Sequence, residues 1–285
     1  MEPGADHLMA VRVVVDSSAG IPKKVARKLG ITVLDLHMTH TEQSEDISTS
    51  GLNSLELAAA YARQLERGKD KGLVALHVGK RLSSTWTAAE AAAAVFDGKV
   101  HVVDTNTAGM AVGAAAIVAA SFAKSGADLP TCVRVAEKTL AASETWLYVN
   151  QLEQMRKSGR LSKAASVISA ALLATKPILH VKEGKLELAT KTRTQAKAFA
   201  KLTDLVAERA SGDPAFVVIQ HSGEEKEASK ELKAMLVDAL SPDSRVIIRK
   251  LTPALVVHTG TGAIGVSAVF NDALELQDPP ADAED

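Results

Sequence analysis

Short runs of β-branched residues alternate with helix-length segments from residue 11 onward, and this alternation constrains the fold more than any other feature. The first four runs predict buried strands. They are VRVVV (11–15), ITVLDL (31–36), LVALHV (73–78) and KVHVVD (99–104). Helices are expected over 22–29, 55–66, 84–96, 108–125 and 129–142, whereas the polar segment 37–52 shows no periodicity. Strands linked by helices form a mainly parallel sheet covered on its faces, so we expect an N-terminal three-layer α/β/α domain.

The alternation changes after residue 144. The runs KPILHV (176–181) and KLELAT (185–190) flank KEG, which is typical of a hairpin turn. Adjacent strands without a crossover helix pair antiparallel, so we expect a C-terminal α/β domain with a mixed sheet. Its other strands are expected at TWLYV, AFVVIQ, RVIIRK and AIGVSAVF, and its helices over 150–157, 163–174, 195–210 and 224–239. The predicted domains are 11–144 and 145–270, with disordered ends over 1–10 and 271–285.

Charge and composition exclude several classes of protein. Aromatic residues are 3% of the chain, too few for a base-stacking platform. The last fifteen residues hold six acidic residues and no Lys or Arg, which leaves 33 basic against 28 acidic residues in 1–270. A formal charge of +5 is too weak for a nucleic-acid surface. The single cysteine, Cys132, and the lack of a signal-peptide pattern in 1–10 favour the cytoplasm.

No cofactor or metal motif is present. The sequence has no phosphate-binding loop, no dinucleotide-binding glycine pattern, no nucleophile elbow and no zinc-binding helix. The eight histidines are scattered without metal-ligand spacing, and His77 and His101 are interpreted as structural because they alternate within apolar strands. The uncharged stretch Thr105–Ala123 is only weakly apolar, so it predicts a buried helix rather than a membrane span.

Hydroxyl residues at the predicted strand ends are the main candidate site. Strand ends and helix starts carry Ser17, Thr49, Ser83, Ser84 and Thr105. A helix N-terminus attracts anions, but Ser83 taken alone is better explained as an N-cap, and the other positions also fit capping loops. In the second half, HTGTGAIG (258–265) places three glycines around His258, which suggests either close approach of backbone or ligand, or a turn with a solvated histidine. Arg160 and Arg193 lie in basic segments that also fit a solvated surface.

Seven segments in order resemble the DegV family of bacterial fatty-acid-binding proteins, which includes the FakB subunits of fatty acid kinase. The resemblance runs from Val11 to Phe270. The segments are DSSAGIP, TSGLN, LSSTWTAA, VVDTNTAGMAVG, KSGRLSKA, TKPIL and HTGTGAIG. They are similar, respectively, to the family's D-S-T-x-x-hydrophobic-P, T-S-Q-P-S, L-S-G-T-Y-Q-S-A, V-x-D-S-x-x-x-S-x-G-x-G, K-G-G-R-I, I-K-P-I-L and H-x-G-P-G-A-x-G.

The resemblance implies a two-domain DegV-like fold and a carrier with no catalysis of its own. In the family a long-chain fatty acid lies between the two domains. By motif, its carboxylate would be bound here by Thr49, Ser83 and His258, with Ser84 where the family has a glycine. The set implied to support the head group or pocket is Ser17, Thr105, Arg160, Thr259 and Gly260. Arg193 is the candidate for docking a separate kinase subunit, which would supply ATP and metal and form an acyl phosphate.

Two other functions stay open at this point. Ser83 and His258 are also compatible with a serine hydrolase, although no acid is evident to orient the histidine. The helix end at Ser83 is compatible with a binder of small phosphorylated metabolites. The sequence does not fix the fatty acid, the kinase or the oligomeric state, and it leaves a transient membrane contact open.

Overall fold

The computed structural model describes residues 10–40, 47–150, 152–161 and 175–270. The chain forms two compact units: unit 1 contains the described residues up to Ala141, and unit 2 begins at Ala142. The helix expected over 163–174 and the two predicted disordered ends, apart from residue 10, lie outside the described residues. Within the described ranges no helix is long and apolar enough to cross a membrane.

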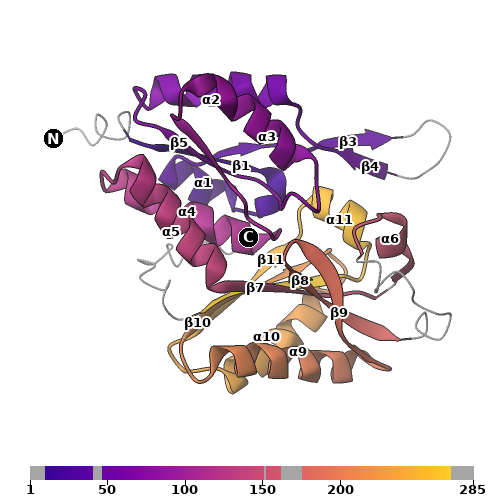
Figure 1. Cartoon of the computed structure of the whole chain (residues 1–285). Helices are drawn as coiled ribbons and strands as arrows, with labels where there is room; N and C mark the ends of the chain where they lie inside the picture. Colours follow the sequence, from indigo (N-terminus) through magenta and orange to yellow (C-terminus); the bar gives the residue numbers. More distant parts are fainter. Residues whose placement is uncertain (1–9, 41–46, 151, 162–174, 271–285) are drawn as a thin grey trace. The chain divides into compact units, whose positions relative to one another are not determined.

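Unit 1 contains the predicted parallel sheet (Figure 1). Its strands are β1 (Arg12–Asp16), β2 (Thr32–Leu34), β5 (Leu73–Leu76) and β6 (Val100–Val103), in the order β2-β1-β5-β6. Every pair is parallel, with Val14 opposite Thr32 and Ala75. The strands are nearly all apolar because both faces are covered. All loops that follow strands therefore lie at one edge of the sheet.

Helices cover both faces of this sheet, which gives the expected three layers. One face packs against α2 (Ser54–Arg67) and α3 (Thr85–Ala93), which is followed by the 3-10 turn η3 (Ala94–Phe96). The other face packs against α4 (Met110–Lys124) and α5 (Leu129–Ala141), and α1 (Lys23–Leu29) lies beside α4 (Figure 1). The helix α4 is buried along most of its length, which confirms that the uncharged stretch is a core helix.

A small hairpin lies within the polar segment 37–52, in which the sequence shows no periodicity. The strands β3 (His37–His40) and β4 (Ile47–Ser50) pair antiparallel and form a sheet of their own. Most of their side chains are exposed, so the sequence lacks the alternation of buried and exposed residues that marks a strand. These two strands were therefore not predicted from the sequence.

Unit 2 contains the predicted mixed sheet, in the order β11-β10-β12-β7-β8-β9. Only β10 (Ala215–His221) and β11 (Arg245–Lys250) are parallel. The antiparallel strands are β7 (Ser143–Tyr148), β8 (Lys176–Lys182), β9 (Lys185–Thr192) and β12 (Ile264–Phe270). The turn of the β8–β9 hairpin places Glu183 and Gly184 at positive φ, as the sequence KEG predicted.

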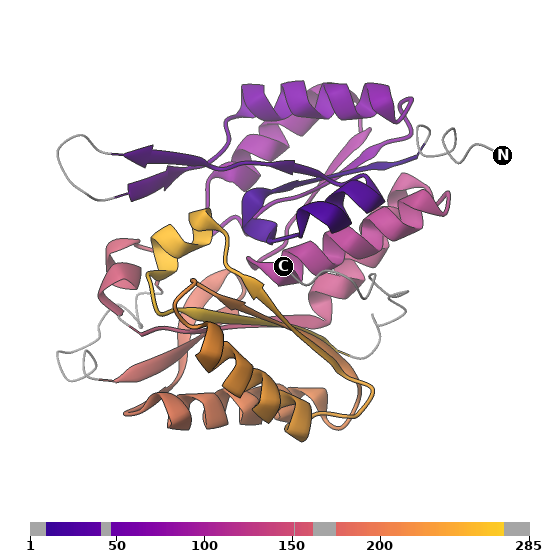
Figure 2. The ribbon, with the colours of Figure 1, turned by 180° about the vertical axis from the view of Figure 1, so that it is seen from behind.

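The helices α9 (Gln195–Ala210) and α10 (Lys226–Ala239) cover one face of this sheet (Figure 2). Two shorter helices, α6 (Leu152–Lys157) and α11 (Pro253–Thr259), lie side by side beyond one end of it. The helix α11 was not expected, because HTGTG suggested a turn. Pro253 opens it at a position where proline is favoured, and Gly260, at a positive φ of 78°, ends it.

Candidate functional site

The predicted hydroxyl residues of unit 1 gather at the carboxyl edge of its parallel sheet. Ser83 is half-buried, and its Oγ accepts a hydrogen bond from the Thr85 backbone at 3.2 Å and lies 3.0 Å from Thr85 Oγ1. Ser84 is exposed, precedes α3 and makes no side-chain cap. Ser83 therefore caps the start of α3, while Ser84 is exposed and its hydroxyl lies close to Gly51.

The segment that carries Thr49 meets the Ser84 turn directly. A Cβ placed on Gly51 would lie 2.7 Å from Thr85 Oγ1 and 3.1 Å from Ser84 Oγ. Only a residue without a side chain permits this approach, so Gly51 holds the end of β4 against the start of α3. Thr49 itself is half-buried on β4, opposite Met38. The structure thus brings together two segments that the sequence separates by more than thirty residues.

A buried network centred on Asp16 supports the same edge. Its Oδ1 accepts from the Ser18 backbone at 2.9 Å and from Ser18 Oγ at 2.5 Å. Its Oδ2 accepts from the Val78 backbone at 2.9 Å and lies 3.2 Å from His77 Nδ1, while His77 Nε2 lies 2.8 Å from the Tyr61 hydroxyl. Both ring nitrogens of His77 are engaged and the residue is fully buried, which confirms its structural role. The exposed His101 is not part of the network.

Hydrogen bonding at Asp16 outweighs the cost of burial. Burial alone raises the pKa of Asp16, but the hydrogen bonds with His77, Ser18 and Val78 lower it to below its ordinary value. Burial raises the pKa of the Tyr61 hydroxyl, so Tyr61 stays neutral. An ionised Asp16 therefore ties the loop after β1 to the loop after β5, which leads to Ser83.

Ser17 and Thr105 are occupied in holding backbone. Ser17 Oγ accepts from the Leu36 backbone at 3.1 Å, and Thr105 Oγ1 donates to the His77 carbonyl at 2.6 Å. Thr105 is also almost completely buried. In addition, the backbone of Gly79 donates to the Thr107 carbonyl at 2.8 Å. Ser17 and Thr105 thus hold the backbone of the loops at this edge through side-chain hydrogen bonds.

In unit 2, His258 lies in the last turn of α11 and is half-buried. Burial, and then the positive charge of Arg160, lower the pKa of His258 to about 4. The imidazole is therefore neutral at pH 7, where it can donate one hydrogen bond but carries no charge. Arg160 follows α6 and is anchored through its guanidinium to the Ser158 carbonyl. A neutral donor beside a fixed cation is a suitable pair for a carboxylate.

The remaining predicted residues of unit 2 have different surroundings. Thr259 is buried, with its Oγ1 3.5 Å from the Gly260 carbonyl, and Gly260 donates to Val256 at 2.8 Å as it ends α11. Arg193 is exposed between the end of β9 and Thr194, the cap of α9. Arg193 is thus a surface residue, as a docking role requires.

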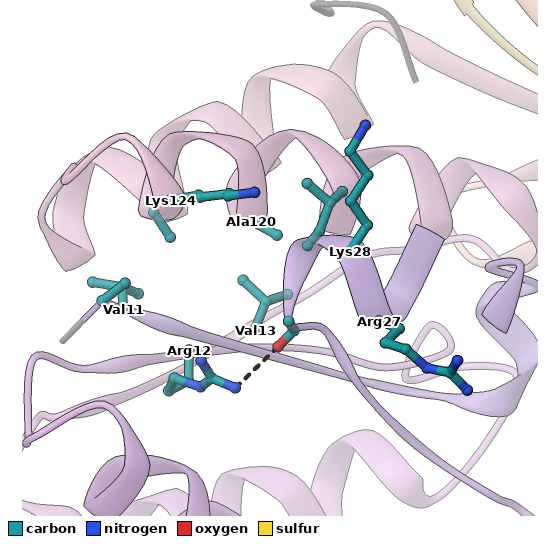
Figure 3. A pocket seen from close by; sticks show the side chains of 11 residues that line it. Val11, Arg12, Val13, Arg27, Lys28, Ala120 and Lys124 are labelled. Atoms are coloured by element: carbon teal, nitrogen blue, oxygen red, sulfur yellow. Dashed lines mark hydrogen bonds between the residues drawn. The ribbon is translucent and has the colours of Figure 1, made fainter. Parts of the chain in front are cut away.

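A small cavity lies at the opposite, amino edge of the unit 1 sheet (Figure 3). Its volume is about 90 Å³, and Val11, Val13 and Ala120 form its apolar wall. Pockets for drug-sized ligands measure roughly 300–1,000 Å³, so this one is too small for an acyl chain. Of its four cations, Arg27 and Lys28 stand in the last turn of α1 and Lys124 in the last turn of α4, where positive charge offsets the helix dipole. None of the predicted site residues lines it.

Sequence reasoning missed two parts of these arrangements. Asp16 stood out only as the first residue of the DSSAGIP segment, and Tyr61 had no signal, since its partner His77 lies sixteen residues away. The turn after β10, described below, was also missed. Across the described residues no group of His, Cys, Asp and Glu could hold a metal ion.

Comparison with known proteins gives consistent results over nearly the whole chain. The family model described as "Uncharacterised protein, DegV family" matches residues 37–271. A DegV domain-containing protein of Corynebacterium glutamicum is 53% identical over 97% of this chain and 100% of its own length. The crystal structure of a DegV family protein from the same organism has a TM-score of 0.89 at 52% identity, covering 93% of this chain and 98% of that one.

A second solved structure carries a functional description. It is that of a DegV family protein from Thermus thermophilus, described by its fatty acid binding. It has a TM-score of 0.83 at 26% identity and covers 92% of this chain and 99% of its own. DegV of Bacillus subtilis, described as a fatty acid binding protein, has a TM-score of 0.79 at 25% identity, with 92% and 100% covered.

Proposed function

Because the chain belongs to the DegV family, we propose that it binds a long-chain fatty acid and presents the carboxylate to a separate fatty acid kinase. The observation that carries the proposal is the similarity, over more than nine-tenths of the chain, to the Thermus relative described by its fatty acid binding. The chain itself then performs no chemistry. The kinase supplies ATP and metal, and the product is an acyl phosphate.

The proposed ligands of the carboxylate are the hydroxyls of Thr49 and Ser83, the Ser84 segment and the imidazole of His258. Each hydrogen bond to a charged group contributes about 1.5–3 kcal/mol. Since His258 is neutral at pH 7, we propose that it acts as a hydrogen-bond donor and that Arg160 supplies the positive charge. Each buried CH₂ adds about 0.8 kcal/mol, so the acyl tail provides most of the affinity.

The first experiment identifies the ligand. Mass spectrometry of the denatured protein, purified from cells, should release a fatty acid of C14–C18 chain length. Protein that arrives empty and takes up no fatty acid in this range would contradict the proposal. A phosphorylated metabolite in place of a lipid would instead favour a binder of small phosphorylated metabolites.

The second experiment tests the residues. Ser83→Ala or His258→Ala should weaken fatty acid binding by about tenfold to a hundredfold, the loss of one charged hydrogen bond. Kinase-dependent acyl-phosphate formation should fall further, because transfer requires an accurately placed carboxylate. Ser125→Ala, an exposed serine at the end of α4, is the matched control. If phosphorylation survives in both site variants, the assignment of these two residues is wrong.

The hydrolase reading makes a different prediction. Within unit 1 and among the described residues, the hydrogen-bond partner of Ser83 Oγ is Thr85, which cannot act as a general base. A fluorophosphonate probe should therefore leave Ser83 unlabelled. Labelling that is lost in Ser83→Ala would instead support an esterase.

A further inference from the structure

The turn after β10 is bonded to both ends of the segment that carries His258. Before the segment, the Leu251 backbone donates to the His221 carbonyl at 2.8 Å. After it, the Ser222 backbone donates to the Ala263 carbonyl at 3.2 Å, and the Gly262 backbone donates to Ser222 Oγ at 2.9 Å. Residues 221–222 therefore form hydrogen bonds to the residues on both sides of segment 252–261 and clamp its two ends.

The clamped segment is short, and few of its described side chains are buried. Its helix, α11, has seven residues, too few to be stable by itself in water. Only Ala254 and Thr259 of these seven are buried, and α6 is its neighbour within unit 2. The placement of His258 therefore depends strongly on how the ends of the segment are held.

Ser222 supplies the only side-chain atom in these three hydrogen bonds, and its hydroxyl both accepts and donates a hydrogen bond. While Oγ accepts from Gly262, its proton goes to Glu225 Oε2 at 2.6 Å. A hydroxyl that donates to a carboxylate becomes a better acceptor, so the two bonds reinforce each other. A Cβ on Gly262 would lie 2.6 Å from Asn150 Cβ, so the Gly262 backbone packs directly against the Asn150 side chain.

We propose that Ser222, oriented by Glu225, is a positioning residue that holds His258 for carboxylate recognition. The part of this inference that concerns the carboxylate rests on the proposed function. The positioning of His258 concerns the protein alone and is tested without ligand. The residue acts only through the loop at Gly262 and touches no ligand itself.

The first test follows the His258 ring by NMR in the ligand-free full chain. Ser222→Ala should release the loop, expose the ring and raise its pKa by at least half a unit from about 4. Ser222→Thr, which keeps the hydroxyl, should restore the original titration. The matched control is Ser229→Ala: this serine is fully buried on α10, and its Oγ has no partner among the described residues. An unchanged His258 titration in Ser222→Ala overturns the proposal.

The second test compares a C16 fatty acid with the alcohol of the same length. Ser222→Ala should reduce the acid-to-alcohol affinity ratio at least fivefold and leave alcohol affinity within twofold. A ratio that does not change, or an equal loss of both affinities together with the melting temperature, overturns the proposal. If the wild-type chain binds neither lipid, the proposed function fails, and the NMR titration still decides whether Ser222 positions His258.

Discussion

Replacing Asp16 by Asn should destabilise unit 1 by about 3 kcal/mol, because the buried carboxylate accepts from two backbone N–H groups and a hydroxyl and faces a ring nitrogen. Asparagine keeps one oxygen, which can still accept from Ser18. Its amide nitrogen then faces Val78 N–H and His77. The imidazole can change tautomer, but the Val78 N–H cannot adapt and loses its acceptor.

The magnitude follows from these groups. One orphaned buried N–H costs about 1–3 kcal/mol, and replacing charged by neutral hydrogen bonds at Ser18 costs about 1 kcal/mol for each of two bonds. Relief from burying an ionised carboxylate offsets part of this loss. The remainder, about 3 kcal/mol, is a large fraction of the stability of an ordinary domain.

The two tryptophans allow the measurement in unit 1 alone, since Trp86 lies in unit 1 and Trp146 in unit 2. Urea unfolding is followed by Trp86 fluorescence in a Trp146→Phe background. With a slope of about 2 kcal/mol per molar urea, the midpoint should fall by about 1.5 M. Asp97→Asn, at an exposed left-handed position, is the control and should change little. A shift below about 0.5 M for Asp16→Asn would refute the reasoning.

Gly262→Ala should lower the free energy of unfolding of unit 2 by at least about 2 kcal/mol, since φ is +82° and Asn150 leaves no space for a Cβ. Gly159→Ala, at φ +70° with open space around it, should cost only about 1 kcal/mol. Equal urea midpoints for the two variants would contradict this. The depressed pKa of His258 means that the unfolded chain takes up a proton first as pH falls. Unit 2 should therefore keep its full stability above pH 6.5 and lose about 1 kcal/mol through His258 by pH 5, after allowance for the partly exposed ring. His258→Gln should reduce that slope in urea titrations without abolishing it, because burial also lowers the pKa of His221. Arg193→Ala should leave fatty acid affinity unchanged and weaken kinase-dependent phosphorylation, and equal loss of both would show a structural role instead.

Local pattern was sufficient for most of the fold. The parallel strands of unit 1 are buried on both faces, so their β-branched runs stand out, and Pro22 and Gly30 bracket α1 as expected. The hairpin β3–β4 and the helix α11 gave no comparable signal. The first has few buried side chains, and the second is seven residues long and ends in the glycine-rich segment that suggested a turn.

Hydrogen bonds between side chains far apart in the sequence could not be predicted. Asp16 and His77 are separated by 61 residues, and Gly262 and Ser222 by 40. No local propensity encodes such a pair, because its members meet only after the sheet has formed. The candidate residues themselves were found from the order of the motifs. The motifs show which residue types form the site but not which other residues hold them in position.

The central place of β12 in the unit 2 sheet has a consequence for synthesis on the ribosome. It pairs with β10 on one side and β7 on the other, so it joins β10–β11 to β7–β8–β9. All strands of unit 1 have been synthesised once residue 103 has left the ribosome. The sheet of unit 2, in contrast, stays in two halves until β12 (Ile264–Phe270) has been synthesised. Domains generally fold as units in the order of their synthesis. A nascent chain halted before β12 would therefore present two open strand edges that the finished protein never exposes.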